Sequence, residues 1–321
     1  MKILVTGGTG FLGSHLVARL LDCGHEVDMM GRDFAHVQNL IARGARPTSA
    51  DLRDGAAVQA ACAGKEAIFH VGAKSEPWGN RADFHAINVG GTEAVVAGCR
   101  LHGVRRLIYV SSPSVVFDGT DQINATEAVP YPARFASVYS LTKKLGEDAV
   151  NAARDKMETI IVRPKAIFGP GDRALLPRLI VAARRGRLPQ IGDGKNLVDL
   201  TYVENVAQAL VLALESPTAI GRTYTITNDE HPALWELIRA TLRHLKLTTQ
   251  LRQVPLGVAL TAATAMEAIA AVTGREPMLT RYSALILART QTYDITAAKR
   301  DLGYCPHIPF SEGIARTLDA L

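Results

Sequence analysis

The sequence predicts an α/β protein in which a Rossmann-type, doubly wound parallel sheet is followed by a smaller, mainly helical C-terminal lobe. Three observations predict this fold class. Strand-like and helix-like segments alternate through the first half, a glycine-rich turn joins the first strand to the first helix, and helical periodicity dominates the second half. The chain has 321 residues, 47% of them apolar, which is enough to bury both faces of such a sheet.

Short apolar runs in the first half predict the strands. They lie at Lys2–Thr6, Glu26–Met30, Ala67–His70, Arg106–Ser111 and Thr159–Val162. Stretches with a helical spacing of apolar residues lie between them, at Gly13–Cys23, Phe84–Leu101 and Ala136–Ala153. Because parallel strands are joined by crossover connections, this alternation predicts βαβ units.

The sequence changes in character after Arg163-Pro164, where Gly169-Pro170-Gly171 breaks the chain. Helical periodicity then returns over Leu175–Arg187, Pro232–Leu245 and Val258–Val272. We therefore assign residues 1–165 to the sheet domain, with strands returning to it from about 196–228, and residues 166–321 mostly to the second lobe.

The segment Val254–Val272 is apolar apart from Glu267. We expect this segment to form an ordinary helix packed in the core of the second lobe. The alternative is an amphipathic helix that lies on a membrane surface or lines an entrance for lipids. The sequence contains no uncharged run of about 18 residues, so it does not predict a transmembrane helix. The expected location is the cytoplasm, with peripheral membrane contact as the alternative.

Charge and composition argue against several classes of function. The formal charge is +5, with 36 basic and 31 acidic residues, and no basic block or basic–aromatic stripe predicts nucleic-acid binding. The four cysteines form no CxxC pair, so we expect reduced thiols. The histidines show no ligand spacing, so we expect no metal. The small basic excess suits a protein that binds anionic phosphates.

Gly7, Gly10 and Gly13 lie in the turn between the first strand and the first helix. Glycine there permits a tight turn, close approach of the backbone to a pyrophosphate, and close packing of helix on strand. The start of the helix offers free N–H groups and the positive end of its dipole. Because a strand precedes this motif and a helix follows it, we predict that residues 1–165 bind NAD(P). Residues 166–321 would then bind most of the substrate.

The residue after the second strand selects between NAD and NADP. NAD enzymes usually carry an acidic residue there, which accepts a hydrogen bond from the ribose 2′-hydroxyl. Here the position is Gly31, followed by Arg32, whose guanidinium suits a 2′-phosphate. We expect NADP(H) to be preferred; NAD(H) is the alternative, with Asp33 as the ribose partner. Asp51 follows the third strand. Considered alone, it is better explained as the N-cap of a helix over Arg53–Ala61.

Tyr139 and Lys143 form a Y-x-x-x-K pair, so on a helix they share one face. A phenol has an ordinary pKa of about 10, and a nearby ammonium is expected to lower it toward the range useful for acid–base catalysis. About thirty residues upstream, a predicted strand ends in serines. Ligands of open α/β sheets bind beyond the carboxyl ends of strands, so a hydroxyl there can stabilise a substrate oxygen. We assign this role to Ser112, with Ser111 and Ser114 as alternatives.

Together these motifs resemble those of the extended short-chain dehydrogenases. They occur in the family order and include His70–Ala73, Asn88–Thr92 and Arg163-Pro164. The resemblance implies that Ser112 stabilises the substrate oxygen, that Tyr139 is the general acid/base, and that Lys143 holds the nicotinamide ribose and modifies the pKa of the phenol. It also implies cofactor contacts from further motif residues, namely Phe11, Leu12, Asp51, Leu52, Ala73, Asn88 and Pro164.

Within that superfamily the sequence resembles the 3β-hydroxysteroid dehydrogenase branch, and in it two groups of enzymes. Sterol-4α-carboxylate 3-dehydrogenases are resembled at Ser114–Gly119, Gly194–Asp199 and Ile226–Asp229. Bacterial 2-alkyl-3-oxoalkanoate reductases are resembled at Ala73-Lys74, Trp78-Gly79, Gly169–Asp172, Leu176–Leu179 and Gly274–Arg281. Both groups handle a hydrophobic 3-oxo or 3-hydroxy acid. Because Arg32 favours NADPH, the resemblance implies reduction of a 2-alkyl-3-oxoalkanoic acid, with the steroid or sterol-carboxylate reaction as the alternative.

Other functions stay open. Nucleotide-sugar epimerases and reductases of the superfamily usually carry an Arg where this chain has Val198, and non-catalytic cofactor sensors typically lose the Tyr or Lys that it keeps. The apolar helices of the second lobe predict a hydrophobic pocket with at most one contact to an anionic group of the substrate. Arg178 and Arg281 are candidates for that contact. A homodimer or an assembly with pathway enzymes is the expected protein partner.

Overall fold

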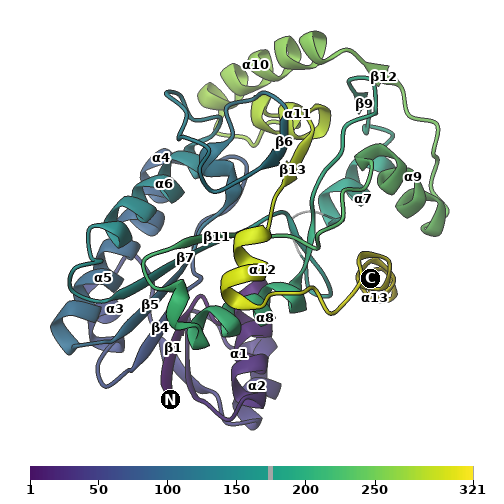
Figure 1. The fold of residues 1–321 in the computed structure, drawn as a ribbon. Coiled ribbons are helices and arrows are strands. Elements are labelled where there is room, and N and C mark those ends of the chain that lie inside the picture. The colour runs from purple at the N-terminus through teal and green to yellow at the C-terminus, as the bar shows by residue number, and fades with distance from the viewer. Residues whose placement is uncertain (173–175, 321) are drawn as a thin grey trace.

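Seven parallel strands form the central sheet, in the order β11–β7–β5–β4–β1–β2–β3 (Figure 1). The computed structural model describes residues 1–172 and 176–320. The strands are β1 (Lys2–Thr6), β2 (Glu26–Gly31), β3 (Arg46–Ser49), β4 (Ala67–His70), β5 (Arg106–Val110), β7 (Glu158–Pro164) and β11 (Thr223–Ile226). The strand order reverses at β1, so the sheet is doubly wound as predicted.

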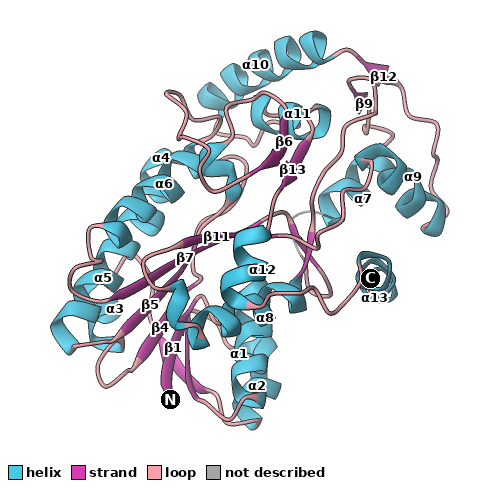
Figure 2. Ribbon diagram, in the orientation of Figure 1, coloured by secondary structure: helices cyan, strands magenta, loops and turns pink. Residues whose placement is uncertain are grey.

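Helices cover both faces of the sheet (Figure 2). One face carries α1 (Phe11–Asp22), with α2 (Gln38–Ala42) beside it, and α8 (Val203–Glu215); the other carries α3 (Gly55–Ala61), α5 (Gly91–His102) and α6 (Val138–Asn151). Successive residues of a strand point to opposite faces. Ile3 and Val5 therefore pack in the core under α1 and α8, whereas Leu4 packs in the core under α3, α5 and α6.

Late segments of the chain return to the sheet domain. β11 pairs with β7 at the edge of the sheet, and α12 (Thr296–Leu302) packs against β11 and α8. Not all of the residues expected to return do so as sheet strands. β10 (Thr201–Tyr202) pairs with β8 (Ile167–Phe168) outside the seven-stranded sheet.

The second lobe lies at the opposite end of the molecule from the N-terminus (Figure 1). It contains α7 (Leu176–Arg184), α9 (Leu234–His244), α10 (Leu256–Thr273) and α11 (Arg281–Ala288), packed around Trp235. Leu175, predicted as part of the first of these helices, lies outside the described residues. Short parallel pairs complete the lobe and join it to the loops above the sheet: β9 (Gln190–Ile191) with β12 (Gln253–Val254), and β6 (Gln122–Ala125) with β13 (Gln291–Tyr293). The last helix, α13 (Phe310–Asp319), packs near β10.

The helix α10 corrects one expectation. It was predicted to pack in the core of the lobe, but only Ala259, Ala263 and Ala270 are buried. Ile269 is 62% exposed and Val272 88% exposed. By length and composition alone, with 18 residues and a mean hydropathy of 1.6, α10 could cross a membrane. The periodicity of the sequence could not reveal the exposure, because apolar residues occur all around this helix.

Candidate active site

The glycine turn between β1 and α1 fits a pyrophosphate. Gly7 has a φ of +65°, and a Cβ there would lie 2.5 Å from the Cα of Gly72, so no side chain fits. A Cβ on Gly13 would lie 2.0 Å from the carbonyl oxygen of Gly7. Gly10 is the N-cap of α1, with no capping side chain and no acidic residue in the first turn, which Phe11 and Leu12 begin. The first N–H groups of α1 are therefore available to an anion.

The end of β2 presents one exposed cation. Arg32 follows Gly31 with its side chain 72% exposed, and its Nη1 lies 3.5 Å from Oδ2 of Asp51. Asp33 is partly engaged in its own turn, since its Oδ1 accepts a hydrogen bond from the N–H of Ala35 at 2.9 Å. Arg32 can therefore reach toward a bound phosphate, whereas Asp33 already has a local partner.

Asp51 is not the helix cap that its position alone suggested. Asp54 caps α3, because its Oδ1 accepts from the N–H of Ala57 at 3.0 Å. Asp51 accepts from the N–H of Arg53 at 2.9 Å and pairs with the Arg53 guanidinium at 2.7 Å. This pairing holds the pKa of the Asp51 carboxyl well below its usual range. Leu52 packs close to Gly72 and Gly91, in the wall beside the glycine turn.

The loop after β4 is fixed by one buried amide. Asn88 is 1% exposed; its Oδ1 accepts from the N–H of Lys74 at 2.7 Å, and its Nδ2 donates to the Lys74 carbonyl and to Thr142 Oγ1, both at 3.0 Å. Asn88 lies in a π-helix, His85–Gly90, between α4 (Arg81–Phe84) and α5. Such π-turns are frequent at functional sites. Asn88 thus orients the Ala73-Lys74 loop relative to α6, and both of its amide hydrogens are already donated within the protein.

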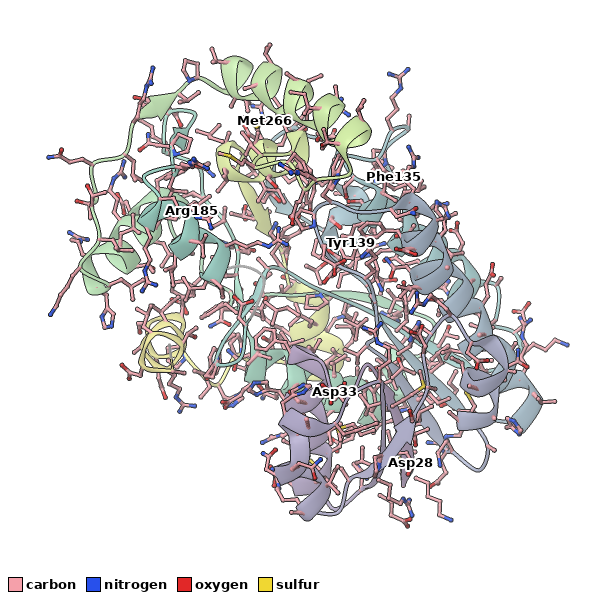
Figure 3. All side chains as sticks on the ribbon, turned by 180° about the vertical axis from the view of Figure 1, so that it is seen from behind. Asp28, Asp33, Phe135, Tyr139, Arg185 and Met266 are labelled. Atoms are coloured by element: carbon pink, nitrogen blue, oxygen red, sulfur yellow. The ribbon has the colours of Figure 1, made fainter. Side chains whose placement is uncertain are left out.

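Tyr139 and Lys143 lie in the first turns of α6. Ser137 caps the helix, since its Oγ accepts from the N–H of Ser140 at 3.0 Å. Lys143 is 2% exposed, and its Nζ lies over the ring of Tyr109, 4.0 Å from the ring centre. Among the described residues no acceptor is hydrogen-bonded to this Nζ, so the ribose hydroxyls of a cofactor could accept from it. Figure 3 shows Tyr139 in the middle of the molecule, between the sheet domain and the lobe that carries Met266 and Arg185.

The charge states of this pair differ from the prediction. Burial raises the pKa of Tyr139 to about 12, and a hydrogen bond with Ser112 acts in the opposite direction. Burial lowers the pKa of Lys143 to about 7, partly offset by the carboxylate of Glu147. Such a lysine is only partly charged at neutral pH. The expected lowering of the Tyr139 pKa by Lys143 is therefore wrong for this structure, in which Ser112 is the group that counteracts burial.

Three serines lie where β5 ends, around the short 3₁₀ helix Pro113–Val116. Ser112 is the one that acts on Tyr139, and its Oγ also accepts from the N–H of Ser114 at 3.2 Å. The hydroxyls of Ser111 and Ser114 are buried without a hydrogen-bond partner in the described structure. Ser112, Tyr139 and Lys143 thus meet at the carboxyl end of the sheet, next to Pro164 at the end of β7.

Comparison with known proteins assigns this chain to a family. Residues 4–256 match the 3-beta hydroxysteroid dehydrogenase/isomerase family. The chain belongs to that family.

Individual proteins support the same assignment. The 2-alkyl-3-oxoalkanoate reductase of Stenotrophomonas maltophilia is 39% identical over 98% of each chain. The sterol-4-alpha-carboxylate 3-dehydrogenase, decarboxylating, of Mus musculus is 35% identical over 99% of this chain and 90% of its own. The structure of UDP-glucuronic acid 4-epimerase from Bacillus cereus in complex with NAD shares the fold, with a TM-score of 0.77, 21% identity, and coverage of 100% of this chain and 98% of that one. This 3-beta hydroxysteroid dehydrogenase family member is thus a nicotinamide-dependent oxidoreductase of the extended short-chain type, and the predicted fold class and branch are confirmed.

In this family member a buried ion pair holds α6 against β7. Arg163 contacts Glu147 through Nε at 2.8 Å and through Nη2 at 2.6 Å, and both side chains are buried. The Tyr131 hydroxyl donates to the same carboxylate at 2.5 Å. Since Glu147 lies one turn beyond Lys143, this network fixes the helix that carries Tyr139 and Lys143. Removing one partner of such a pair typically costs about 3–5 kcal/mol.

Two residues near the site were missed by the sequence analysis. Tyr282, in the first turn of α11, interacts electrostatically with Tyr139 and lies beside Ser114. Lys165 follows Pro164, is 9% exposed, and donates through Nζ to Oε1 of Gln291 at 2.6 Å. Burial lowers the pKa of Lys165 to about 8. Lys165 adjoins the motif Arg163-Pro164, which could have drawn attention to it, but Tyr282 reaches the site only through the packing of α11.

The two arginines considered for an anionic contact are engaged at the surface. Arg178 pairs with Glu276 at 2.8 Å, and its side chain is 45% exposed. Arg281 pairs with Glu267 at 2.9 Å, and its side chain is 62% exposed. Over the described residues, no group of three or more His, Cys, Asp or Glu side chains is placed to hold a metal ion.

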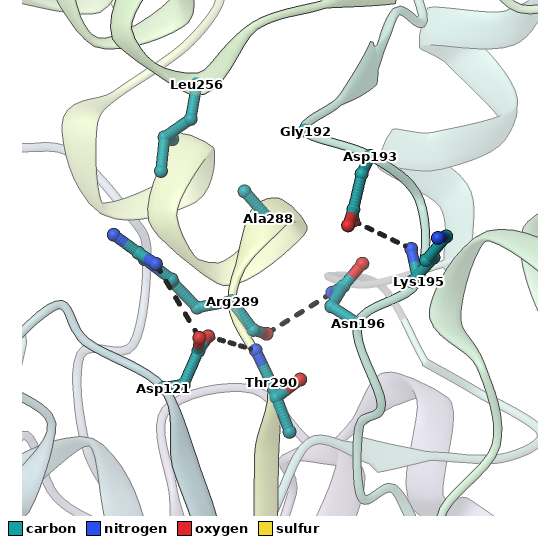
Figure 4. Close-up of a pocket in the computed structure, with 9 residues that line it drawn as sticks. All are labelled: Asp121, Gly192, Asp193, Lys195, Asn196, Leu256, Ala288, Arg289 and Thr290. Carbon is teal, nitrogen blue, oxygen red and sulfur yellow. Dashed lines mark hydrogen bonds and ion pairs between the residues drawn. The ribbon is translucent and has the colours of Figure 1, made fainter.

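One cavity of about 300 Å³ lies between α10, α11 and the β9 loop (Figure 4). Asp121 pairs there with Arg289 at 3.6 Å and accepts from the N–H of Thr290 at 2.9 Å. Asn196 donates to the carbonyl of Arg289 at 3.2 Å. The residues lining this cavity include none of the catalytic or cofactor candidates, so we do not assign it to the reaction.

Proposed function

We propose that this protein uses NADPH to reduce the 3-oxo group of a hydrophobic 2-alkyl-3-oxoalkanoic acid. The observation that carries the proposal is the meeting of Ser112, Tyr139 and Lys143 at the carboxyl end of the sheet, next to a second lobe whose core is apolar. The similarity to a 2-alkyl-3-oxoalkanoate reductase over nearly the full length of both chains supports the substrate class.

Each residue of the proposed site has a defined task. The nicotinamide of the bound cofactor supplies the hydride. Tyr139 donates a proton to the carbonyl oxygen as negative charge develops there, and Ser112 donates a hydrogen bond to the same oxygen. The raised pKa of Tyr139, about 12, suits this direction because the phenol keeps its proton at neutral pH. Lys143 holds the ribose and becomes more fully charged against its hydroxyls.

The preference for NADPH rests on the end of β2. Arg32 is exposed there, and the only carboxylate that it pairs with in the described structure lies 3.5 Å away. Asp33, the candidate partner for an NAD ribose, is engaged with its own turn. A 2′-phosphate of NADPH could therefore pair with Arg32. A 2′-hydroxyl of NADH would have to compete with the N–H of Ala35 for the Asp33 carboxylate.

The residue at position 198 supports a hydrophobic substrate over a nucleotide sugar, because nucleotide-sugar enzymes usually carry an arginine there. Val198 stands there, is 5% exposed, and packs with Leu200 and Phe168 in an apolar cluster. A nucleotide diphosphate would lack its usual partner at this point. The sterol-4α-carboxylate reaction is the second candidate, favoured by the similarity to the mouse enzyme.

Turnover assays separate these candidates. NADPH and NADH would each be tested with a series of 2-alkyl-3-oxo acids, a sterol-4α-carboxylate and a UDP-sugar. We expect turnover of the acids with NADPH, and kcat/KM rising with chain length until the pocket is full, because each buried CH₂ contributes up to about 0.8 kcal/mol. A flat response to chain length, or faster turnover of the sterol or the sugar, would contradict the proposed substrate while leaving hydride transfer standing.

A further inference from the structure

We propose that Ser114 and Tyr282 form a carboxylate site beside Tyr139, which positions the acid group of the substrate. This inference rests on the proposed function and extends it to two residues that the hydride transfer itself does not use.

The substrate's own geometry requires such a site close to Tyr139. In a 3-oxo acid a single carbon separates the carbonyl carbon from the carboxylate carbon. When Tyr139 and Ser112 bind the 3-oxygen, the carboxylate must lie only a few ångströms away. A carboxylate taken out of water needs hydrogen-bond donors, because an unpaired buried charge is very costly.

Ser114 has the unused donor that this position needs. It lies two residues after Ser112, and its backbone N–H is bound to the Ser112 hydroxyl at 3.2 Å, so the two side chains belong to one fixed turn. Ser114 is 8% exposed, and its Oγ is buried without a hydrogen-bond partner in the described structure. A buried hydroxyl without a partner is uncommon and calls for an explanation, which a bound ligand would supply.

Tyr282 brings a second donor to the same place from α11. Its ring forms a T-shaped pair with Phe117, with ring centres 6.4 Å apart and an interplanar angle of 72°. One turn later, Leu285 Cδ1 lies 3.3 Å from the position a Cβ would take on Gly119, so α11 rests against the loop that follows Ser114. The Tyr282 hydroxyl lies close to Ser114 and Tyr139 but makes no well-formed hydrogen bond with the Ser114 Oγ. Burial raises the pKa of Tyr282, so the phenol keeps its proton and can donate.

In the described part of the chain, two cations of this region are already engaged elsewhere. Arg281, the residue next to Tyr282, pairs with Glu267 at 2.9 Å, and Lys165 donates to Gln291 at 2.6 Å. Among the described residues, the two neutral hydroxyls therefore remain for the carboxylate. Loss of one hydrogen bond to a charged group is expected to weaken binding roughly tenfold or more.

The test compares the stable 2-alkyl-3-hydroxy acid with its methyl ester, both oxidised with NADP⁺. Wild-type protein is expected to prefer the acid. Tyr282→Phe should raise the KM for the acid roughly tenfold, with little change in kcat, and leave the KM for the ester within about twofold. Ser114→Ala should do the same to a similar extent. Tyr304→Phe is the matched control, because its buried hydroxyl donates to the Thr227 carbonyl at 2.9 Å in a separate part of the fold.

The outcomes are distinct. If wild-type protein oxidises neither the acid nor the ester, both this inference and the proposed function are wrong. If wild-type protein oxidises the acid but Tyr282→Phe slows acid and ester equally, or leaves the KM for the acid unchanged, the carboxylate site alone is wrong. Thermal unfolding and NADP⁺ affinity of each variant show whether a loss reflects misfolding, and a Ser114→Thr variant that keeps the hydroxyl should retain the preference for the acid.

Discussion

At the scale of single residues, the proton donor is the simplest part of the site to test. Tyr139→Phe removes a hydroxyl and no cofactor contact. We expect kcat to fall by about 10²–10⁴-fold, the usual contribution of general acid–base catalysis, with NADPH affinity nearly unchanged by fluorescence titration. Tyr224→Phe, whose hydroxyl bonds Asp301 at 3.1 Å, serves as a control and should keep its activity. Activity of Tyr139→Phe within a few-fold of wild type would remove Tyr139 as the acid.

Lys143 gives a prediction about pH. Burial lowers its pKa from 10.5 to about 7 in this structure. Ribose hydroxyls that accept hydrogen bonds from Nζ favour the charged form, so the pKa of Lys143 should rise when the cofactor binds. At pH 8 the free protein is mostly deprotonated at this site and the complex is not, so binding should take up a fraction of one proton.

Calorimetry of NADPH binding in buffers of different ionisation enthalpy measures that uptake. At pH 8 the 2′-phosphate of NADPH is already ionised, so it contributes little to the measured proton uptake. The uptake should disappear in Lys143→Met, which should also bind the cofactor more weakly. Equal proton uptake by wild type and variant would exclude Lys143 as its source.

Arg32 is the residue to test for cofactor choice. Arg32→Ala should weaken NADPH about tenfold and NADH little, because its contact is charge-assisted but exposed to solvent. Arg53→Ala is a matched control, since Arg53 pairs with the same Asp51 carboxylate at 2.7 Å. A wild-type protein that binds NADH as tightly as NADPH would contradict the assignment and make Asp33 the ribose partner.

At the scale of elements, α10 is the least expected part of the lobe. We propose that its exposed side chains at Val258, Ile269 and Val272 rest on a lipid surface. The position of α10 supports this proposal. It packs on α11, the helix that carries Tyr282, so the exposed apolar side chains of α10 lie outside the proposed substrate site. A lipid-like acid could then pass from a membrane to the site without crossing much water.

Sedimentation with lipid vesicles tests this contact. Wild-type protein should co-sediment with vesicles, and the Ile269→Glu/Val272→Glu variant should lose most of this binding while keeping kcat on a short, soluble substrate. Leu101→Glu, an equally exposed apolar position at 68% on α5, is the control and should still bind. Loss of a dimer instead of loss of vesicle binding in the α10 variant would identify the face as a subunit interface.

At the scale of the whole molecule, sequence reasoning was strongest where chemistry and periodicity coincide. The glycine turn, the alternating strands and the Tyr139/Lys143 spacing are local patterns, and the sheet follows from them. The contact of Tyr282 with the site depends on how α11 packs, which no spacing along the chain encodes. The same holds for the low pKa of Lys143 and for the exposure of α10, since both depend on what the fold buries and what it leaves out.

The late return of β11 and α12 to the sheet bears on how the protein is synthesised. The edge of β7 has no strand partner until residues 223–226 have left the ribosome, and the layer formed by α8 and β11 is not complete until residues 296–302 follow. An open parallel edge beside apolar residues is a template for wrong pairing with other chains. The β7 edge is therefore open from the synthesis of residues 158–164 until that of residues 223–226, and a chaperone that shields it during this interval should reduce aggregation of the nascent chain.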